Sequence, residues 1–89
     1  KELEIVRAKV PAIKASLAAR VTEVMQATRT MSLSKIPGVA ETLDWANALV
    51  ALQATGLNEQ IVAETLGCFL KDEGDIATFK AELPGMIRD

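Results

Sequence analysis

The sequence predicts an all-α fold, a small bundle of four or five helices. Apolar residues recur at intervals of three and four along most of the chain, and no stretch alternates apolar and polar residues as a strand does. The apolar fraction is 49%, only 3% of residues are aromatic, and Ala, Leu, Val and Ile dominate, a mixture that suits packed helices. At 89 residues, the whole chain 1–89 is expected to be a single domain.

Two helices are predicted in the first third of the chain. The first covers residues 2–9, where Leu3 and Val6 begin an apolar stripe, and it ends before Pro11, which disfavours helical geometry in the preceding residue. The second covers residues 15–30 and is amphipathic. Its apolar side carries Leu17, Val21, Val24 and Met25, and its polar side carries Arg20, Glu23 and Arg29.

The third predicted helix covers residues 39–55 and follows a connection, residues 32–38, that is rich in Ser, Pro and Gly. Apolar side chains cover most of its circumference, so we expect it to be central. Trp45, the only tryptophan, could anchor a partner or fill the core. The leucines four and seven positions later favour the core. Gly56 suits the left-handed position just past this helix.

Turn signals introduce the last two helices. Asn58 is a suitable N-cap for a helix over residues 59–71. After the acidic turn KDEGD, Asp75 is expected to cap a final helix over residues 76–83, and the following Pro-Gly pair is expected to end it.

Composition excludes several classes of function. The net charge is −2, from 10 basic and 12 acidic residues, and no basic cluster indicates a nucleic-acid surface. With no histidine and a single cysteine, Cys68, the chain has neither a His/Cys metal site nor a Ser-His or Cys-His nucleophile pair. Cys68 lies in an apolar run and is expected in the core. No glycine belongs to a Walker A or GxGxxG motif, so no catalytic residue is predicted.

The location of the protein is predicted from indirect signs. No stretch reaches the roughly 18 to 20 apolar residues that a membrane span needs, and no leader of charged then apolar residues opens the chain. We therefore expect no membrane contact and a cytoplasmic location, which the single cysteine fits. The chain begins at Lys1 and is helical almost at once, so we expect a piece of a longer protein.

Two groups of acidic residues have alternative interpretations. Glu41 and Asp44 lie three positions apart near a predicted helix start, where they could form an acid/base pair or a cation site. Stabilisation of the positive end of the helix is the favoured interpretation. Asp72, Glu73 and Asp75 resemble a calcium loop only superficially, because the spaced ligands and terminal Glu of an EF-hand are missing, so a solvated turn is favoured.

Residues 33–56, LSKIPGVAETLDWANALVALQATG, carry a family resemblance. The run resembles the segment Leu-x-Lys-x-Pro-(Gly/Ser)-Val-x-Glu-Thr-(Leu/Ile)-Asp-Trp-Ala-x-Ala-Leu of MoxR-type AAA+ ATPases, within the small helical lid that follows their ATPase core. The opening EIVRAKVP and the later stretch LNEQIVAETLGCFLKDEGDI are also similar to parts of that lid. The resemblance extends over nearly the whole chain.

The resemblance implies a function that the isolated residues do not. A lid of this kind covers the nucleotide bound by the core, and its movement couples ATP hydrolysis to the motion of a ring of identical subunits. The parent protein would be an ATPase that uses ATP and Mg. MoxR-type members resemble chaperones that mature metal-cofactor protein complexes, commonly together with a von Willebrand A-domain protein. The implied partners are thus the ATPase core of the same chain, the other subunits of the ring and a von Willebrand A-domain protein.

The resemblance also implies a site at the Pro-Gly turn. Many AAA+ lids present an arginine that reaches the nucleotide at the start of the helix after this turn, but the equivalent position here is Ala40, and only Lys35 before the turn offers a weak substitute. The helix N-terminus favours an anion, which Glu41 would oppose. We therefore expect contact on the adenine side. The predicted nucleotide edge consists of Ile36, Pro37, Gly38, Val39 and Ala40.

A second class of function competes with the lid. The chain could be a free-standing helical module that binds another protein through an apolar groove, without nucleotide chemistry. A Walker A motif about two hundred residues before Lys1, roughly the size of an ATPase core domain, would support the lid.

Overall fold

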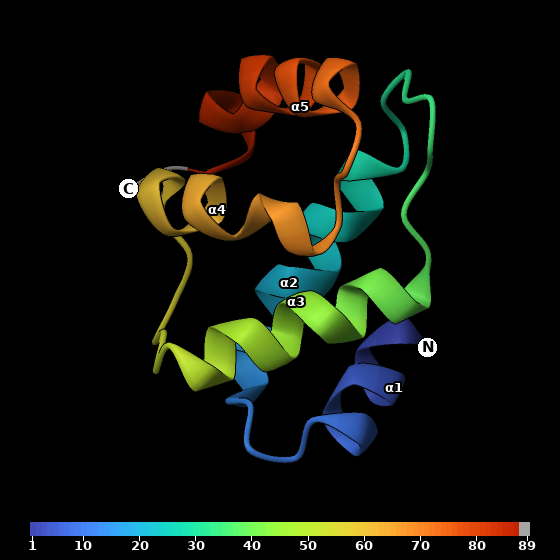
Figure 1. Ribbon diagram of the computed structural model, residues 1–89. Helices are drawn as coiled ribbons and strands as arrows, with labels where there is room; N and C mark the ends of the chain where they lie inside the picture. Colours follow the sequence, from blue (N-terminus) through green and yellow to red (C-terminus); the bar gives the residue numbers. More distant parts are fainter. Residues whose placement is uncertain (88–89) are drawn as a thin grey trace.

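The computed structural model describes residues 1–87, so the last two positions of the predicted domain lie outside the described residues. Within that range the protein is all-helical, which confirms the predicted fold class (Figure 1). The elements in order are α1 (Glu2–Lys9), α2 (Ala15–Thr28), α3 (Val39–Ala51), α4 (Glu59–Thr65), the 3₁₀ turn η1 (Leu66–Cys68) and α5 (Glu73–Met86).

The first two helices follow the prediction closely. α1 has the predicted bounds, and the backbone N–H of Val10 closes its last turn on the carbonyl of Val6 at 2.8 Å. α2 ends at Thr28, two residues before the predicted end. The side chains of Thr28 and Thr30 donate to backbone carbonyls of the preceding turn, a competition that favours helix ends.

The end of α3 differs from the prediction. The helix stops at Ala51, and the residue in the left-handed region is Gln53, with φ 58°, whereas no glycine among residues 1–87 has a positive φ. The N–H of Gln53 donates to Val50 O at 2.9 Å and that of Ala54 to Leu49 O at 3.0 Å, which is a Schellman motif. The expectation that Gly56 occupies this position is therefore wrong.

The fourth predicted helix is shorter and divided. Asn58 is the N-cap, as predicted, and its side-chain oxygen accepts the N–H of Ile61 at 2.8 Å. The α-helix ends at Thr65 rather than at Lys71, and the chain tightens into η1. Residues 69–72 then connect η1 to α5.

The last helix is longer than predicted at both ends. Asp72, not Asp75, is its N-cap, and the Asp72 carboxylate accepts the N–H of Asp75 at 3.0 Å. Pro84 and Gly85 lie inside α5, which continues to Met86. A proline in the last turn removes only one intrahelical bond, and the N–H of Ile87 closes that turn on Leu83 O at 3.0 Å.

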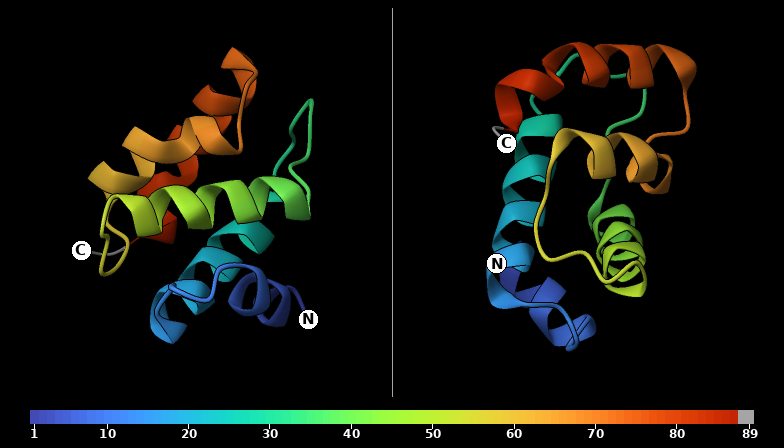
Figure 2. Two further views of the ribbon diagram at one scale, coloured as in Figure 1. Left: turned by 60° about the horizontal axis from the view of Figure 1, so that its bottom comes forward. Right: turned by 90° about the vertical axis from the view of Figure 1, so that its left-hand side faces the viewer.

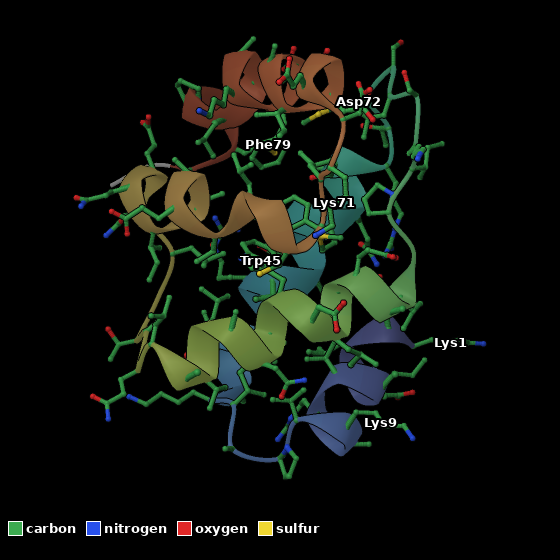
Figure 3. All side chains as sticks on the ribbon, viewed as in Figure 1. Lys1, Lys9, Trp45, Lys71, Asp72 and Phe79 are labelled. Atoms are coloured by element: carbon green, nitrogen blue, oxygen red, sulfur yellow. The ribbon has the colours of Figure 1, made fainter. Side chains whose placement is uncertain are left out.

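Two further views show how the helices surround one core (Figure 2). α2 contacts α1, α3 and α5, while α3 also contacts α4 and η1. Trp45 on α3 is fully buried, as predicted, and its indole N–H donates to the Thr65 hydroxyl of α4 at 2.7 Å. Phe69 lies between two rings, with its centroid 4.6 Å from that of Trp45 and 5.4 Å from that of Phe79. Figure 3 shows Trp45 and Phe79 pointing into the interior from α3 and α5.

Candidate functional site

The predicted nucleotide edge lies where the loop of residues 29–38 enters α3. Its residues differ in exposure: Pro37 is buried, whereas Gly38 and Ala40 are exposed. The two large apolar side chains also face solvent, Ile36 with 60% and Val39 with 39% of its surface exposed. They are two of the four large apolar residues exposed among residues 1–87, the others being Ile5 and Leu52.

A largely buried polar cluster holds the backbone of this turn at the Pro37 carbonyl. The Arg29 guanidinium binds the Glu2 carboxylate with two parallel bonds, Nη1 to Oε1 at 2.6 Å and Nη2 to Oε2 at 2.7 Å. Its Nε donates to the Pro37 carbonyl at 2.8 Å. We call Glu2, Arg29, Thr42 and the Pro37 carbonyl the Arg29 clasp. The clasp joins α1, the end of α2, the turn and α3.

Thr42 completes the clasp from the first turns of α3. Its hydroxyl is buried, accepts from Arg29 Nη2 at 2.9 Å and donates to Glu2 Oε2 at 2.7 Å. The hydrogen bonds from Arg29 lower the pKa of Glu2 below 4.5; burial opposes this shift, while Thr42 and the charge of Arg29 support it. The bonds to Glu2 raise the pKa of Arg29, against the effect of its burial. The ion pair is thus held in its charged form.

A second contact holds the middle of the same loop. The carboxylate of Asp75, which is 3% exposed, accepts the backbone N–H of Ser34 at 2.7 Å through Oδ1 and that of Lys35 at 3.0 Å through Oδ2. Figure 1 shows the loop rising beside the start of α5 before it descends to α3. Asp75 therefore does not belong to a solvated turn, although Asp72 and Glu73 are exposed as predicted.

The N-terminus of α3 already has a negative partner. Glu41 Oε1 accepts the N–H of Gly38 at 2.8 Å, which confirms the predicted stabilising role of Glu41. Asp44 is exposed on the next turn. A phosphate brought to this helix end would meet the Glu41 carboxylate, so the end is poorly suited to bind an anion.

The turn alone provides no enclosed ligand site. A pocket of about 110 Å³ lies beside it, lined by Lys35, Ile36, Pro37, Glu41, Phe69 and Lys71. Small-molecule sites have volumes of about 300 to 1,000 Å³. A larger hollow of about 420 Å³ involves none of the predicted residues and is lined by Glu4, Arg7, Ala8, Pro11 and Ile13. The pocket beside the turn is therefore smaller than an ordinary small-molecule site.

Lys35 and Lys71 border the small pocket, but both are engaged in the fold. The backbone of Lys35 binds Asp75 while its side chain is exposed, as predicted, and the Lys71 ammonium donates to the Gly67 carbonyl. Cys68 is partly buried against the core. Across residues 1–87 every buried side-chain nitrogen or oxygen has a hydrogen-bond partner, so no orphaned group indicates a ligand.

Neither a metal centre nor a membrane span is found among residues 1–87. No group of three or more His, Cys, Asp or Glu side chains is arranged to hold a metal ion in the described part of the chain. Over these 87 residues, no helix combines the length and the apolar character needed to cross a membrane.

Sequence reasoning missed the residues that hold the turn. Glu2 and Thr42 are 40 positions apart and Ser34 and Asp75 are 41 apart, and no periodic pattern links such positions. Arg29 had been placed on the polar side of α2, and Asp75 had been expected as a cap. The one signal for Thr42 is its place in the run Glu-Thr-Leu-Asp-Trp, where the resemblance leads one to expect a threonine.

Comparisons with known proteins give no further identification. No family model matches the chain. No curated protein matches it, and neither does any solved structure.

Proposed function

We propose that this chain is the helical lid of a MoxR-type AAA+ ATPase. In this role it covers the nucleotide that the ATPase core binds with Mg, and it couples hydrolysis to the motion of a ring of identical subunits. The ring would act as a chaperone in the maturation of metal-cofactor protein complexes, together with a von Willebrand A-domain protein. The chain contributes a wall to the nucleotide site and no catalytic group.

The structural roles of the family-like residues support this proposal. Glu41 accepts the N–H of Gly38, Thr42 belongs to the Arg29 clasp, and Trp45 fills the centre of the core. Each residue has a definite task at the position where the resemblance specifies it. These three roles support the assignment of the run to a helical lid, whereas Asp44, its other polar member, is exposed.

The observation that carries the proposal is the pair of exposed apolar side chains on a fixed turn. Ile36 and Val39 lie on either side of Pro37 and Gly38, and the backbone between them is bound by Arg29. Scattered exposed apolar residues are ordinary, but a fixed turn orders their surface before binding and reduces the entropy lost on association. This arrangement suits contact with the core and the adenine side of a nucleotide.

The experiment compares two ends of α3 in the full-length protein. The double variant Ile36→Asp/Val39→Asp places two charges on the turn, and Leu52→Asp, a residue with 58% exposure beyond the other end of α3, is the matched control. We expect the double variant to weaken ATP binding or turnover at least tenfold, because buried charge at an interface is costly. Leu52→Asp should change neither quantity. Equal behaviour of the two variants would exclude the turn as the nucleotide edge.

The competing function is a free-standing module that binds another protein through an apolar groove. One observation separates it from the lid. The sequence upstream of Lys1 either contains a Walker A motif or does not. Calorimetric titration of the 89-residue chain with ATP and Mg should give no micromolar binding, because the chain has no phosphate loop and no arginine at position 40. Micromolar binding by the chain alone would contradict the lid assignment.

A further inference from the structure

The loop of residues 29–38 is held at two separate places by different helices. Arg29, which directly follows α2, donates to the Pro37 carbonyl and so holds the last part of the loop. Asp75, in the first turn of α5, holds its middle through the N–H groups of Ser34 and Lys35. Figure 3 shows Asp72, the residue before α5, beside this loop. The second contact therefore links α5 to a segment about 40 positions earlier in the chain.

We propose that Asp75 is a positioning residue that couples α5 to the Pro37–Gly38 turn. A carboxylate that accepts two consecutive N–H groups fixes both the position and the direction of the backbone that carries them. Lys35 is directly followed by Ile36, the most exposed large apolar residue among residues 1–87. A shift or rotation of the first turn of α5 is therefore transmitted to the surface formed by Ile36 and Val39.

Neither the helix nor the loop needs this contact for its own stability. Asp72 already caps α5 by accepting the N–H of Asp75. Ser34 and Lys35 are exposed residues, so water could satisfy their N–H groups if the carboxylate were absent. The main consequence of the contact is thus the relative placement of the two segments. Its role in an enzyme rests on the proposed function, because the turn is the nucleotide edge only if the chain is a lid.

The first test measures the turn itself, by amide hydrogen exchange and NMR on the 89-residue chain. In Asp75→Asn the side chain keeps its size, but only one of its terminal atoms can accept a hydrogen bond. We expect exchange at Ser34 or Lys35 to rise about tenfold or more, with shifted signals over residues 36–40. The indole N–H of Trp45, which binds Thr65, should keep its protection and so report an intact core.

Two control variants separate positioning from general stability. Glu73→Gln alters an exposed carboxylate of the same helical turn and leaves both the Asp72 cap and the loop contacts of Asp75 in place, so exchange at Ser34 and Lys35 should stay near that of the unaltered chain. Asp44→Asn removes one exposed charge and tests the change in net charge. If Asp75→Asn does not fold, Asp75→Glu retains the charge, displaces the carboxylate by one methylene, and should shift the signals of residues 36–40.

The second test uses the full-length protein and separates KM for ATP from kcat. Asp75→Asn should change the KM at least threefold, whereas Glu73→Gln should not. The coupling is overturned if exchange at Ser34 and Lys35 is unchanged in Asp75→Asn, or if it rises only together with that of the Trp45 indole. It is also overturned if Glu73→Gln has the same effect on KM. If the unaltered full-length protein binds no ATP, the proposed function fails, and the exchange experiment alone decides whether the coupling exists.

Discussion

The aromatic centre of the molecule and the Arg29 clasp hold the same helix α3 in different ways. Trp45, Phe69 and Phe79 join α3 to the second half of the chain through contact between rings, with one hydrogen bond from the indole to Thr65. The clasp joins α3 to α1 and α2 through an ion pair and a shared hydroxyl. The first depends on the removal of apolar surface from water, and the second on the pairing of every polar atom.

This difference determines how each region responds to substitution. An apolar side chain removed from the centre leaves a cavity whose cost depends on its size. When one side chain of the clasp is replaced, the loss of stability depends on which partner remains. A buried charge without its counterion is more unfavourable than no charge at all. The two regions can therefore be distinguished by single and double variants.

The largest effect is expected for Trp45→Ala. The indole is fully buried and contacts the ring of Phe69, so its removal leaves a large cavity and takes away the donor to the Thr65 hydroxyl, which still donates to the Ile61 carbonyl. We expect the free energy of unfolding to fall by about 3 to 5 kcal/mol, as measured by urea denaturation. Asp44→Ala, the exposed neighbour on α3, is the control and should change it by less than about 0.5 kcal/mol. A loss below about 1 kcal/mol for Trp45→Ala would place the indole outside the core.

The next effect is expected in the clasp. Arg29→Met leaves the Glu2 carboxylate with only the Thr42 hydroxyl as a donor and removes the bond from Arg29 Nε to the Pro37 carbonyl. It should cost about 2 to 3 kcal/mol, less than a fully buried pair, because the Arg29 side chain is 24% exposed. Adding Glu2→Gln removes the uncompensated charge, so the double variant should lose about 1 kcal/mol less than the sum of the single losses.

A second arginine on α2 provides the control for this experiment. Arg20 binds Glu23 at the surface, where the two side chains are 39% and 62% exposed. Arg20→Met should therefore cost less than about 1 kcal/mol in the same urea experiment. If Arg20→Met and Arg29→Met cost the same amount, the clasp contributes no more than a surface ion pair.

The contrast also explains how much could be predicted from the sequence. Helical spacing predicts Trp45 as a core residue and predicts that each helix exists, because a local pattern determines which face is apolar, but it did not give the ends of α2 to α5 correctly. The clasp joins side chains 13, 27 and 40 positions apart, and the partner of a charged residue on an amphipathic helix depends on the tertiary arrangement. For the same reason Asp75 was expected as a helix cap, a local role, and its contacts with Ser34 and Lys35 were missed. The exposure of Ile36 and Val39 follows from the fixed path of the loop, which no local pattern encodes.

The clasp should also respond to pH in a way that the aromatic centre does not. Because the folded-state pKa of Glu2 lies below its ordinary value of 4.5, the unfolded chain binds the proton more readily than the folded one. The ion pair therefore contributes stability above about pH 4.5, and this contribution is lost as the pH falls through the folded pKa. We expect Glu2→Gln to be less stable than the unaltered chain at pH 7 and the difference to shrink below pH 4.5, in urea experiments at each pH. A constant difference across that range would contradict the pairing.

The smallest effect concerns the end of α3, away from both regions. Gln53 has φ 58°, a conformation that costs a residue with a Cβ atom about 1 to 2 kcal/mol and costs glycine little. Because glycine also gains freedom in the unfolded chain, Gln53→Gly should raise the free energy of unfolding by only about 0.5 kcal/mol. Gly56 lacks a positive φ, and a Cβ atom there would meet no atom within 4 Å, so Gly56→Ala should be neutral or slightly stabilising. The two variants together test the Schellman motif by thermal unfolding. If Gly56→Ala destabilises the chain and Gln53→Gly does not stabilise it, the left-handed residue is the glycine and α3 extends further than Ala51.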